Sequence, residues 1–108
     1  MIMISSDVIR GYNDTIIICL LRDAHSFGYE ISKQIKRISE EKYIIKETTL
    51  YSAFTRMEKN GYIESFYGSE TGGKRRTYYK ITDAGEEYYR QKCEEWDVTK
   101  EVIDRFVI

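Results

Sequence analysis

The 108-residue sequence contains few of the residues on which catalytic and metal sites depend. It has no proline, one histidine (His25) and two cysteines (Cys19 and Cys93). Two cysteines do not make a disulfide framework, and a lone histidine does not predict a metal site. No nucleophile–base pair and no glycine-rich phosphate loop is recognisable. We therefore expect no enzymatic activity, no cofactor and no metal, and we interpret His25 as a solvated loop residue.

Long apolar segments are also missing. A membrane-spanning helix needs about 18 apolar residues in succession, and no such run occurs. The first residues, Met1–Met3, lack the basic and apolar regions of a signal peptide. We expect a cytoplasmic protein of one small domain, with no membrane association. Because a chain of this length buries only a modest core, oligomerisation would add to its stability.

Charge of either sign is nearly balanced in total but is unevenly distributed. The net charge is −1, yet residues 1–82 hold 13 Lys and Arg against 10 Asp and Glu. Residues 83–108 hold 4 against 8. The total charge argues against binding all along a polyanion, but a local basic surface on the first part is compatible with nucleic-acid binding.

Residues 48–60 are predicted to form a helix with one apolar face. Leu50, Ala53, Phe54 and Met57 recur at spacings of three and four residues, and Gly61 follows where the helix should end. The opposite face carries hydroxyl groups and Arg56. Such a face suits a DNA major groove, with Arg56 on guanine and the hydroxyls on several bases. Any amphipathic helix has a polar face, so an ordinary surface helix is the alternative.

A β-hairpin is predicted directly after this helix. The segments Tyr62–Tyr67 and Arg75–Ile81 are rich in aromatic and β-branched residues. The loop between them contains glycines and three consecutive basic residues, which can reach phosphates beside the groove. A solvated basic loop is the alternative. The residues predicted to contact DNA are Lys46, Thr48, Thr49, Tyr51, Ser52, Thr55, Arg56, Lys74, Arg75 and Arg76.

Two helices are predicted before residue 46, over residues 8–22 and 27–39. The first is apolar nearly all round, which predicts burial on more than one side, and a second copy of the chain would supply the second side. Ser5, Ser6 or Asp7 is expected to cap the first helix, Ser26 the second and Thr48 the one that follows. Residues 43–45 are expected to form a short strand beside the hairpin.

The last predicted helix runs from about Asp83 to near Val107, with Thr82 as its N-cap. Its apolar residues recur every three or four positions and make a seam too long to bury within one copy of the chain, so we expect it to pair with a second copy. The predicted dimer-interface residues are Tyr12, Ile16, Tyr89, Cys93, Trp96, Ile103, Phe106 and Val107.

Three motifs resemble the PadR family of bacterial transcriptional regulators. They are GYEISKQI (28–35), TLYSAFxRMEKxGYIE (49–64) and GGKRRxYYxITxAG (72–85). Ser52 departs from the pattern, since many members carry proline there; its loss does not threaten the fold, because proline near a helix start only pre-sets φ. The resemblance implies a mainly α winged helix-turn-helix with a small hairpin (1–82) and a C-terminal dimerisation helix (83–108). It implies a homodimeric repressor that binds palindromic promoter DNA.

A chain this short resembles the short-form members of the family, some of which sense drugs. In those proteins flat aromatic molecules stack on paired tryptophans at the dimer centre, and Trp96 matches that position. The resemblance thus implies a small aromatic effector bound near Trp96, Tyr89 and Cys93. A solid interface anchored by Trp96 is the alternative. For the whole chain, a winged-helix module that binds protein instead of DNA is a second class of function.

Overall fold

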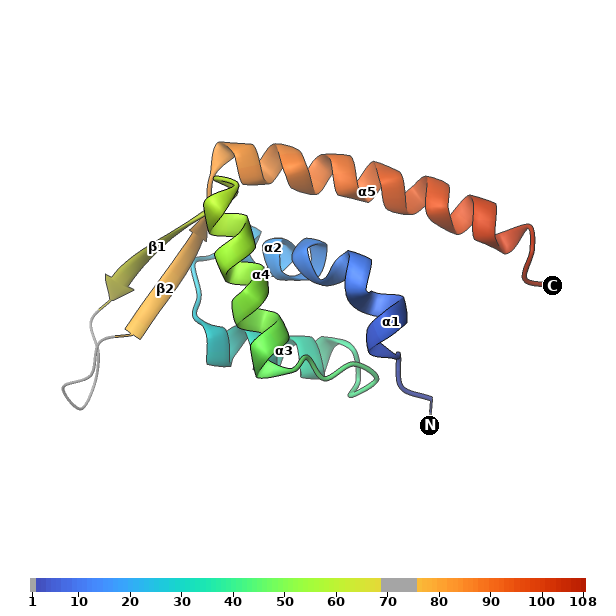
Figure 1. Cartoon of the computed structure of the whole chain (residues 1–108), viewed down its shortest axis with the longest axis horizontal. Helices are drawn as coiled ribbons and strands as arrows, with labels where there is room; N and C mark the ends of the chain where they lie inside the picture. The colour runs from blue at the N-terminus through green and yellow to red at the C-terminus, as the bar shows by residue number, and fades with distance from the viewer. Residues whose placement is uncertain (1, 69–75) are drawn as a thin grey trace.

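The computed structural model describes residues 2–68 and 76–108. The protein is mainly α-helical with one antiparallel hairpin, which confirms the predicted fold class. Figure 1 shows the hairpin at one end of the molecule and the last helix running along the others towards the opposite end. The elements are α1 (Ser6–Ile9), the 3₁₀ helix η1 (Arg10–Tyr12), α2 (Asn13–Asp23), α3 (Gly28–Ile38), α4 (Glu47–Lys59), β1 (Ile63–Gly68), β2 (Arg76–Ile81) and α5 (Asp83–Asp104).

The hydrophobic core lies between α2, α3, α4 and the hairpin. All four residues of the predicted apolar face of α4 are buried, together with isoleucines from α2 and α3. Phe54 of α4 stacks on Tyr79 of β2, with ring centroids 4.0 Å apart and planes 15° from parallel. Burial of a large apolar side chain contributes roughly 1.5–3 kcal/mol. The core therefore fixes α4 by its apolar side and turns its polar side outward.

The predicted first helix is interrupted, so a single helix over 8–22 was wrong. The chain forms α1, then the 3₁₀ helix η1, then α2. Gly11 lies inside η1, and the low helix propensity of glycine explains why the break falls there. The predicted capping by the segment 5–7 is confirmed, because the Ser5 hydroxyl accepts a hydrogen bond from the Val8 amide (3.3 Å).

Two of the predicted caps were wrong. The N-cap of α3 is Phe27, and Ser26 instead exchanges two backbone hydrogen bonds with Tyr79 of β2, at 3.0 and 2.7 Å. The N-cap of α4 is Lys46, so Thr48 lies in the first turn of that helix. Neither cap residue of these helices makes a side-chain capping bond. The first backbone N–H groups of both helices are thus without a side-chain partner from the cap.

The short strand expected at residues 43–45 does not form. These residues have no regular structure, although Tyr43 and Ile45 are buried and Ile44 is exposed. The bridge between Ser26 and Tyr79 explains the difference, because Ser26 takes the place beside β2. The alternation of burial held the side chains in place without a strand partner.

The predicted cap of the last helix is confirmed. The Thr82 hydroxyl accepts from the Gly85 amide (3.0 Å) and donates to the Gly61 carbonyl (2.6 Å), which ties the start of α5 to the end of α4. The helix ends at Asp104, three residues before the predicted end near Val107. None of the described helices combines the length and the apolar composition needed to cross a membrane.

Candidate nucleic-acid interface

The outward face of α4 presents a cluster of hydroxyl groups. Thr48, Tyr51, Ser52 and Thr55 are exposed, and Thr49 is half-buried. We call these first four residues the hydroxyl face. The Thr55 hydroxyl donates to the Tyr51 carbonyl (3.0 Å), within the helix itself. The side chains of Thr48 and Ser52 make no hydrogen bond in the part of the chain that the structure describes, so they are the ones best placed to meet base edges.

Arg56 lies on the same helix but on the side towards α2. Its guanidinium donates two parallel hydrogen bonds to the Asp14 carboxylate, Nε to Oδ2 at 2.9 Å and Nη2 to Oδ1 at 2.5 Å. The pKa of Arg56 is raised above its ordinary value chiefly by this hydrogen bond. The predicted contact of Arg56 with guanine would require this ion pair to open.

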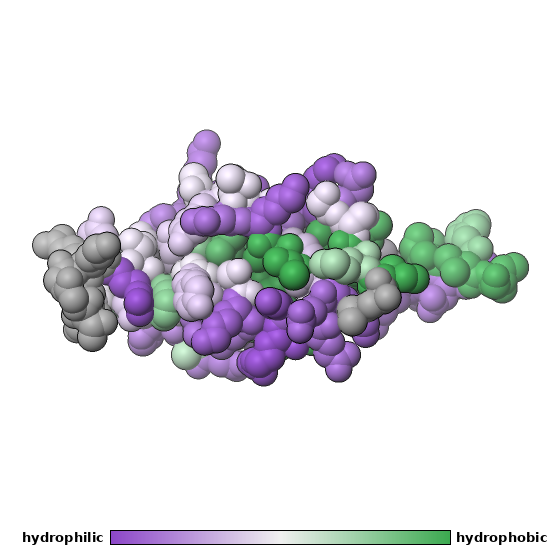
Figure 2. All heavy atoms as spheres, turned by 90° about the horizontal axis from the view of Figure 1, so that it is seen from below, coloured by the Kyte–Doolittle hydropathy of each residue, from purple (hydrophilic) through white to green (hydrophobic). Residues whose placement is uncertain are grey.

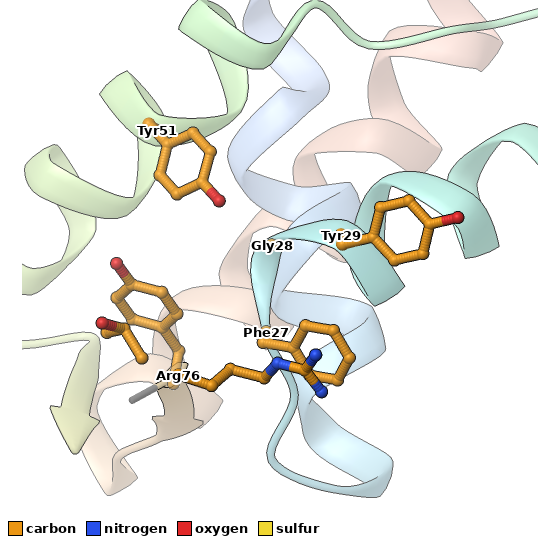
Figure 3. Close-up of a pocket in the computed structure, with 7 residues that line it drawn as sticks. Phe27, Gly28, Tyr29, Tyr51 and Arg76 are labelled. Carbon is orange, nitrogen blue, oxygen red and sulfur yellow. The ribbon is translucent and has the colours of Figure 1, made fainter. Parts of the chain in front are cut away.

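A small cavity of about 300 Å³ separates the hydroxyl face from the hairpin. Figure 3 shows the Tyr51 hydroxyl directed towards Gly28 at the start of α3, and the Arg76 side chain crossing below Phe27. The Arg76 guanidinium stacks on the Phe27 ring at 4.1 Å. Cations and free backbone N–H groups at a helix start are what a phosphate needs.

Gly28 is required where Tyr51 crosses the start of α3. A Cβ at residue 28 would lie 2.4 Å from the Tyr51 Oη and 2.9 Å from its Cζ. The absence of a side chain lets the phenol approach the helix start closely. The glycine of the GYEISKQI motif thus has a local physical reason in this fold.

The predicted basic tip lies only partly in the described structure. Arg76 begins β2 and is exposed. Lys74 and Arg75 fall within residues 69–75, outside the described residues. Lys46, the N-cap of α4, is exposed at the far end of the hydroxyl face. The described cations therefore flank the hydroxyl face from both ends of the surface.

On another side of the molecule an apolar groove of about 840 Å³ runs between α5 and the first helices. The Trp96 ring stands edge-on to Tyr12, with centroids 5.0 Å apart, and is 43% exposed. Figure 2 shows apolar atoms gathered at the C-terminal end of the chain. The groove contains six of the eight predicted dimer-interface residues, namely Tyr12, Ile16, Tyr89, Cys93, Trp96 and Ile103. The other two, Phe106 and Val107, lie past the end of α5 and are strongly exposed.

The three residues predicted to contact a ligand share this groove. The Tyr89 hydroxyl donates to the Cys19 Sγ at 3.5 Å. Hydrogen bonding to Cys19 and to Cys93 raises the pKa of Tyr89 well above its ordinary value, and burial adds to the effect. The guanidinium of Arg22 lies over the Tyr89 ring, 4.5 Å from its centroid.

Sequence reasoning missed the N-terminal segment of the groove. The Ile4 amide donates to the Lys42 carbonyl (2.9 Å), and this contact brings Ile4 and Val8 to the groove. The signal was the run of alternating methionine and isoleucine at residues 1–4. An apolar start of this kind predicts a packed segment, but its partner 38 residues away leaves no trace in local spacing.

Comparisons with known proteins agree with this arrangement. The family described as "Transcriptional regulator PadR-like family" matches residues 17–91. A transcriptional regulator from Clostridium thermocellum is similar at 65% identity, over 98% of this chain and 100% of that one, with a TM-score of 0.91. A PadR family transcription regulator from Clostridium difficile R20291 is similar at 36% identity, over 91% of this chain and 100% of that one, with a TM-score of 0.78.

A relative without a solved structure extends the likeness along the sequence. The uncharacterized protein X of Lysinibacillus sphaericus is 43% identical over 105 residues, which is 97% of this chain and 96% of that protein. The family match covers α3, α4, the hairpin and the first part of α5. The chain therefore belongs to the PadR-like family of transcriptional regulators.

Proposed function

We propose that this regulator binds palindromic promoter DNA as a homodimer and represses transcription. The observation that carries the proposal is the hydroxyl face of α4, open to solvent beside Arg76 and the uncapped start of α3. In a helix-turn-helix protein the second helix enters the major groove and the preceding helix meets the backbone. Residues 1–82 would form the DNA-binding domain, and the protein would act in the cytoplasm.

Hydroxyl groups and cations divide the work at such an interface. Thr48 and Ser52 would meet base edges, because their side chains are exposed near the start of α4. Arg76, Lys46 and the two predicted basic residues before Arg76 would neutralise phosphates. Tyr51, Thr49 and Thr55 lie at the margin of the same face and would contact sugar or phosphate.

The apolar groove and the exposed end of α5 support the homodimer. A single copy leaves Trp96, Ile103, Phe106 and Val107 exposed, and apolar patches of this kind commonly mark interfaces. A two-fold axis near α5 would bury the seam of one copy against that of the other, so residues 83–108 would form the dimerisation helix. The two copies of α4 would then enter successive major grooves, about 34 Å apart.

The same groove supports release of DNA by a small aromatic molecule. Trp96, Tyr89 and Cys93 line a space large enough for such a ligand in one copy of the chain. A ligand releases DNA only if it binds more tightly to a dimer in which the two α4 helices have the wrong spacing. The alternative is that side chains of the second copy fill the groove completely.

Fluorescence anisotropy with a labelled duplex from the protein's own promoter tests the DNA-binding function. Between about 50 and 200 mM salt, a protein with six or more phosphate contacts loses on the order of a thousandfold in affinity. Arg76→Gln should weaken binding and make the salt dependence shallower. Arg90→Gln is the matched control, since Arg90 lies on α5 and pairs with Glu87 there. Affinity that is weak and independent of salt would refute the proposal and favour a protein-binding module.

A further inference from the structure

Asp14 occupies a junction between three helices. It lies in the first turn of α2, and its carboxylate receives the two hydrogen bonds from Arg56 of α4. The side chain of Asp14 is 17% exposed and that of Arg56 is 52% exposed. A planar guanidinium that donates two parallel bonds to one carboxylate fixes direction as well as distance. The pair therefore sets how α4 is rotated on α2.

The third helix at the junction is α5. Burial is the main cause of the raised pKa of Tyr88, and the negative charge of Asp14 raises that pKa further. Asp14 also adds to the raised pKa of Lys92, which arises chiefly from its hydrogen bond to Glu95. Both Tyr88 and Lys92 belong to α5, and the Lys92 ammonium lies 5.6 Å from the centre of the Tyr88 ring. The carboxylate of Asp14 thus faces α4 and α5 together.

A second contact joins the same two helices near this point. Tyr62, which follows the end of α4, stacks on Tyr88 with centroids 4.3 Å apart. The backbone at the end of α4 is held there by the Thr82 hydroxyl. The end of α4 is thus anchored to α5 by stacking and capping, and Asp14 and Arg56 anchor α4 to α2 four residues before Asn60, its C-cap.

We propose that Asp14 is a positioning residue for DNA recognition, and that Arg56 is a strut between α4 and α2 instead of a contact to a base. The inference rests on the DNA-binding function proposed above. In a dimer held through α5, the distance between the two α4 helices depends on the angle that each makes with its own α5. A carboxylate that faces both helices fixes that angle.

The competing role for Asp14 predicts the opposite effect on affinity. If Asp14 only held Arg56 until DNA drew it away, the ion pair would compete with DNA. Its removal would then leave affinity unchanged or increase it. If the pair positions α4, removal of either partner weakens DNA binding, and removal of the second partner adds nothing further.

The test is a double-mutant cycle on DNA affinity with Asp14→Asn, Arg56→Gln and the double variant. Measurements use the same labelled duplex over a range of salt, far below the thermal unfolding of each variant. We expect each single variant to bind about fivefold more weakly and the double variant to match the single ones. We expect the slope of log K against log salt to equal that of the wild type, because no phosphate contact is lost. Asp7→Asn, in an exposed pair with Arg10, is the matched control and should bind as the wild type does.

Arg56→Lys separates the strut from a simple cationic contact. Lysine keeps the charge but cannot donate two parallel bonds in a fixed plane. A strut predicts that Arg56→Lys weakens binding nearly as much as Arg56→Gln; a phosphate contact predicts that it restores affinity. If an Asp14 variant fails to fold, the two Arg56 variants still decide between these outcomes.

Two results would overturn the inference while leaving the proposed function intact. One is an Asp14→Asn variant with unchanged or tighter binding. The other is an Arg56→Gln variant whose salt slope is shallower by about 0.9, the value for one lost phosphate contact. Absence of any salt-dependent binding by the wild type would instead refute the DNA-binding function, and with it the positioning role.

Discussion

Gly85 of α5 lies directly against the backbone carbonyl of Tyr62, the residue that links α4 to the hairpin. A Cβ at residue 85 would be 2.1 Å from the Tyr62 oxygen and 2.9 Å from the Ile81 Cγ1. Gly85 is buried and helical, so its role is close approach and not an unusual φ angle. The start of α5 is thereby pressed onto both ends of the hairpin.

Gly85→Ala should destabilise the fold. The atom in the way belongs to the backbone, so relief requires a shift of α5, and overpacking of this kind costs about 1–3 kcal/mol. We expect a lower Tm in thermal unfolding followed by circular dichroism. Gly11→Ala is the control, because nothing lies within 4 Å of a Cβ there, and its Tm should stay equal or rise. Equal stability of the two variants would contradict the contact.

Removal of the Tyr43 hydroxyl should also cost stability. Tyr43 donates a hydrogen bond to the Oδ1 of Asn13, and both residues are buried. Tyr43→Phe leaves the Asn13 oxygen without this donor, at a cost of about 1–3 kcal/mol. Chemical denaturation of Tyr43→Phe, Asn13→Ala and the double variant measures the coupling. Strictly additive losses would show that the two groups do not interact.

The protein should lose stability as pH rises above 10.0, the ordinary pKa of tyrosine. Burial raises the pKa of Tyr43, Tyr79 and Tyr88 in the folded chain. The unfolded chain then loses its phenol protons first, so stability is complete below the ordinary pKa and falls as pH rises towards the folded values.

Thermal unfolding on either side of this pH measures the effect. Tyr79→Phe should reduce the fall in Tm on the alkaline side, since one of the buried phenols is removed. Tyr29→Phe is the control, because Tyr29 is largely exposed. A Tm that stays constant through the ionisation of the unfolded tyrosines would contradict the burial of these hydroxyls.

Binding of a planar aromatic cation such as ethidium should quench the fluorescence of Trp96. Trp96 is the only tryptophan, so the signal reports on the groove alone. Stacking on the indole and proximity to the Tyr12 ring favour a flat cationic guest. Free N-acetyltryptophanamide corrects for absorption by the dye. Quenching equal to that of the free amide, up to millimolar dye, would mean that the groove is filled by protein.

Local patterns in the sequence predicted what depends on neighbouring residues. The apolar face of α4 follows from its spacing, and Gly61 does adopt a positive φ of 79° at the end of that helix. The Thr82 cap likewise needs only the three residues that follow it. Each of these features is decided within one or two helical turns.

Contacts between distant residues were beyond such patterns. Arg56 and Asp14 are 42 positions apart, and a polar face on α4 does not show which of its residues another helix engages. Ser26 is a good capping residue, but its backbone pairs with Tyr79 because the fold brings β2 beside it. Tertiary structure here overrides local preference, and it does so at the residues that place α4.

The most direct test of the account is a hydroxyl-radical footprint on genomic fragments selected by the protein. Two copies joined through α5, each placing one α4 in a major groove, predict two protected segments related by a two-fold axis and about 10 base pairs apart. Sedimentation of the same complex should give two protein chains per site. A single protected segment bound by one chain, or no fragment retained at moderate salt, would contradict the account.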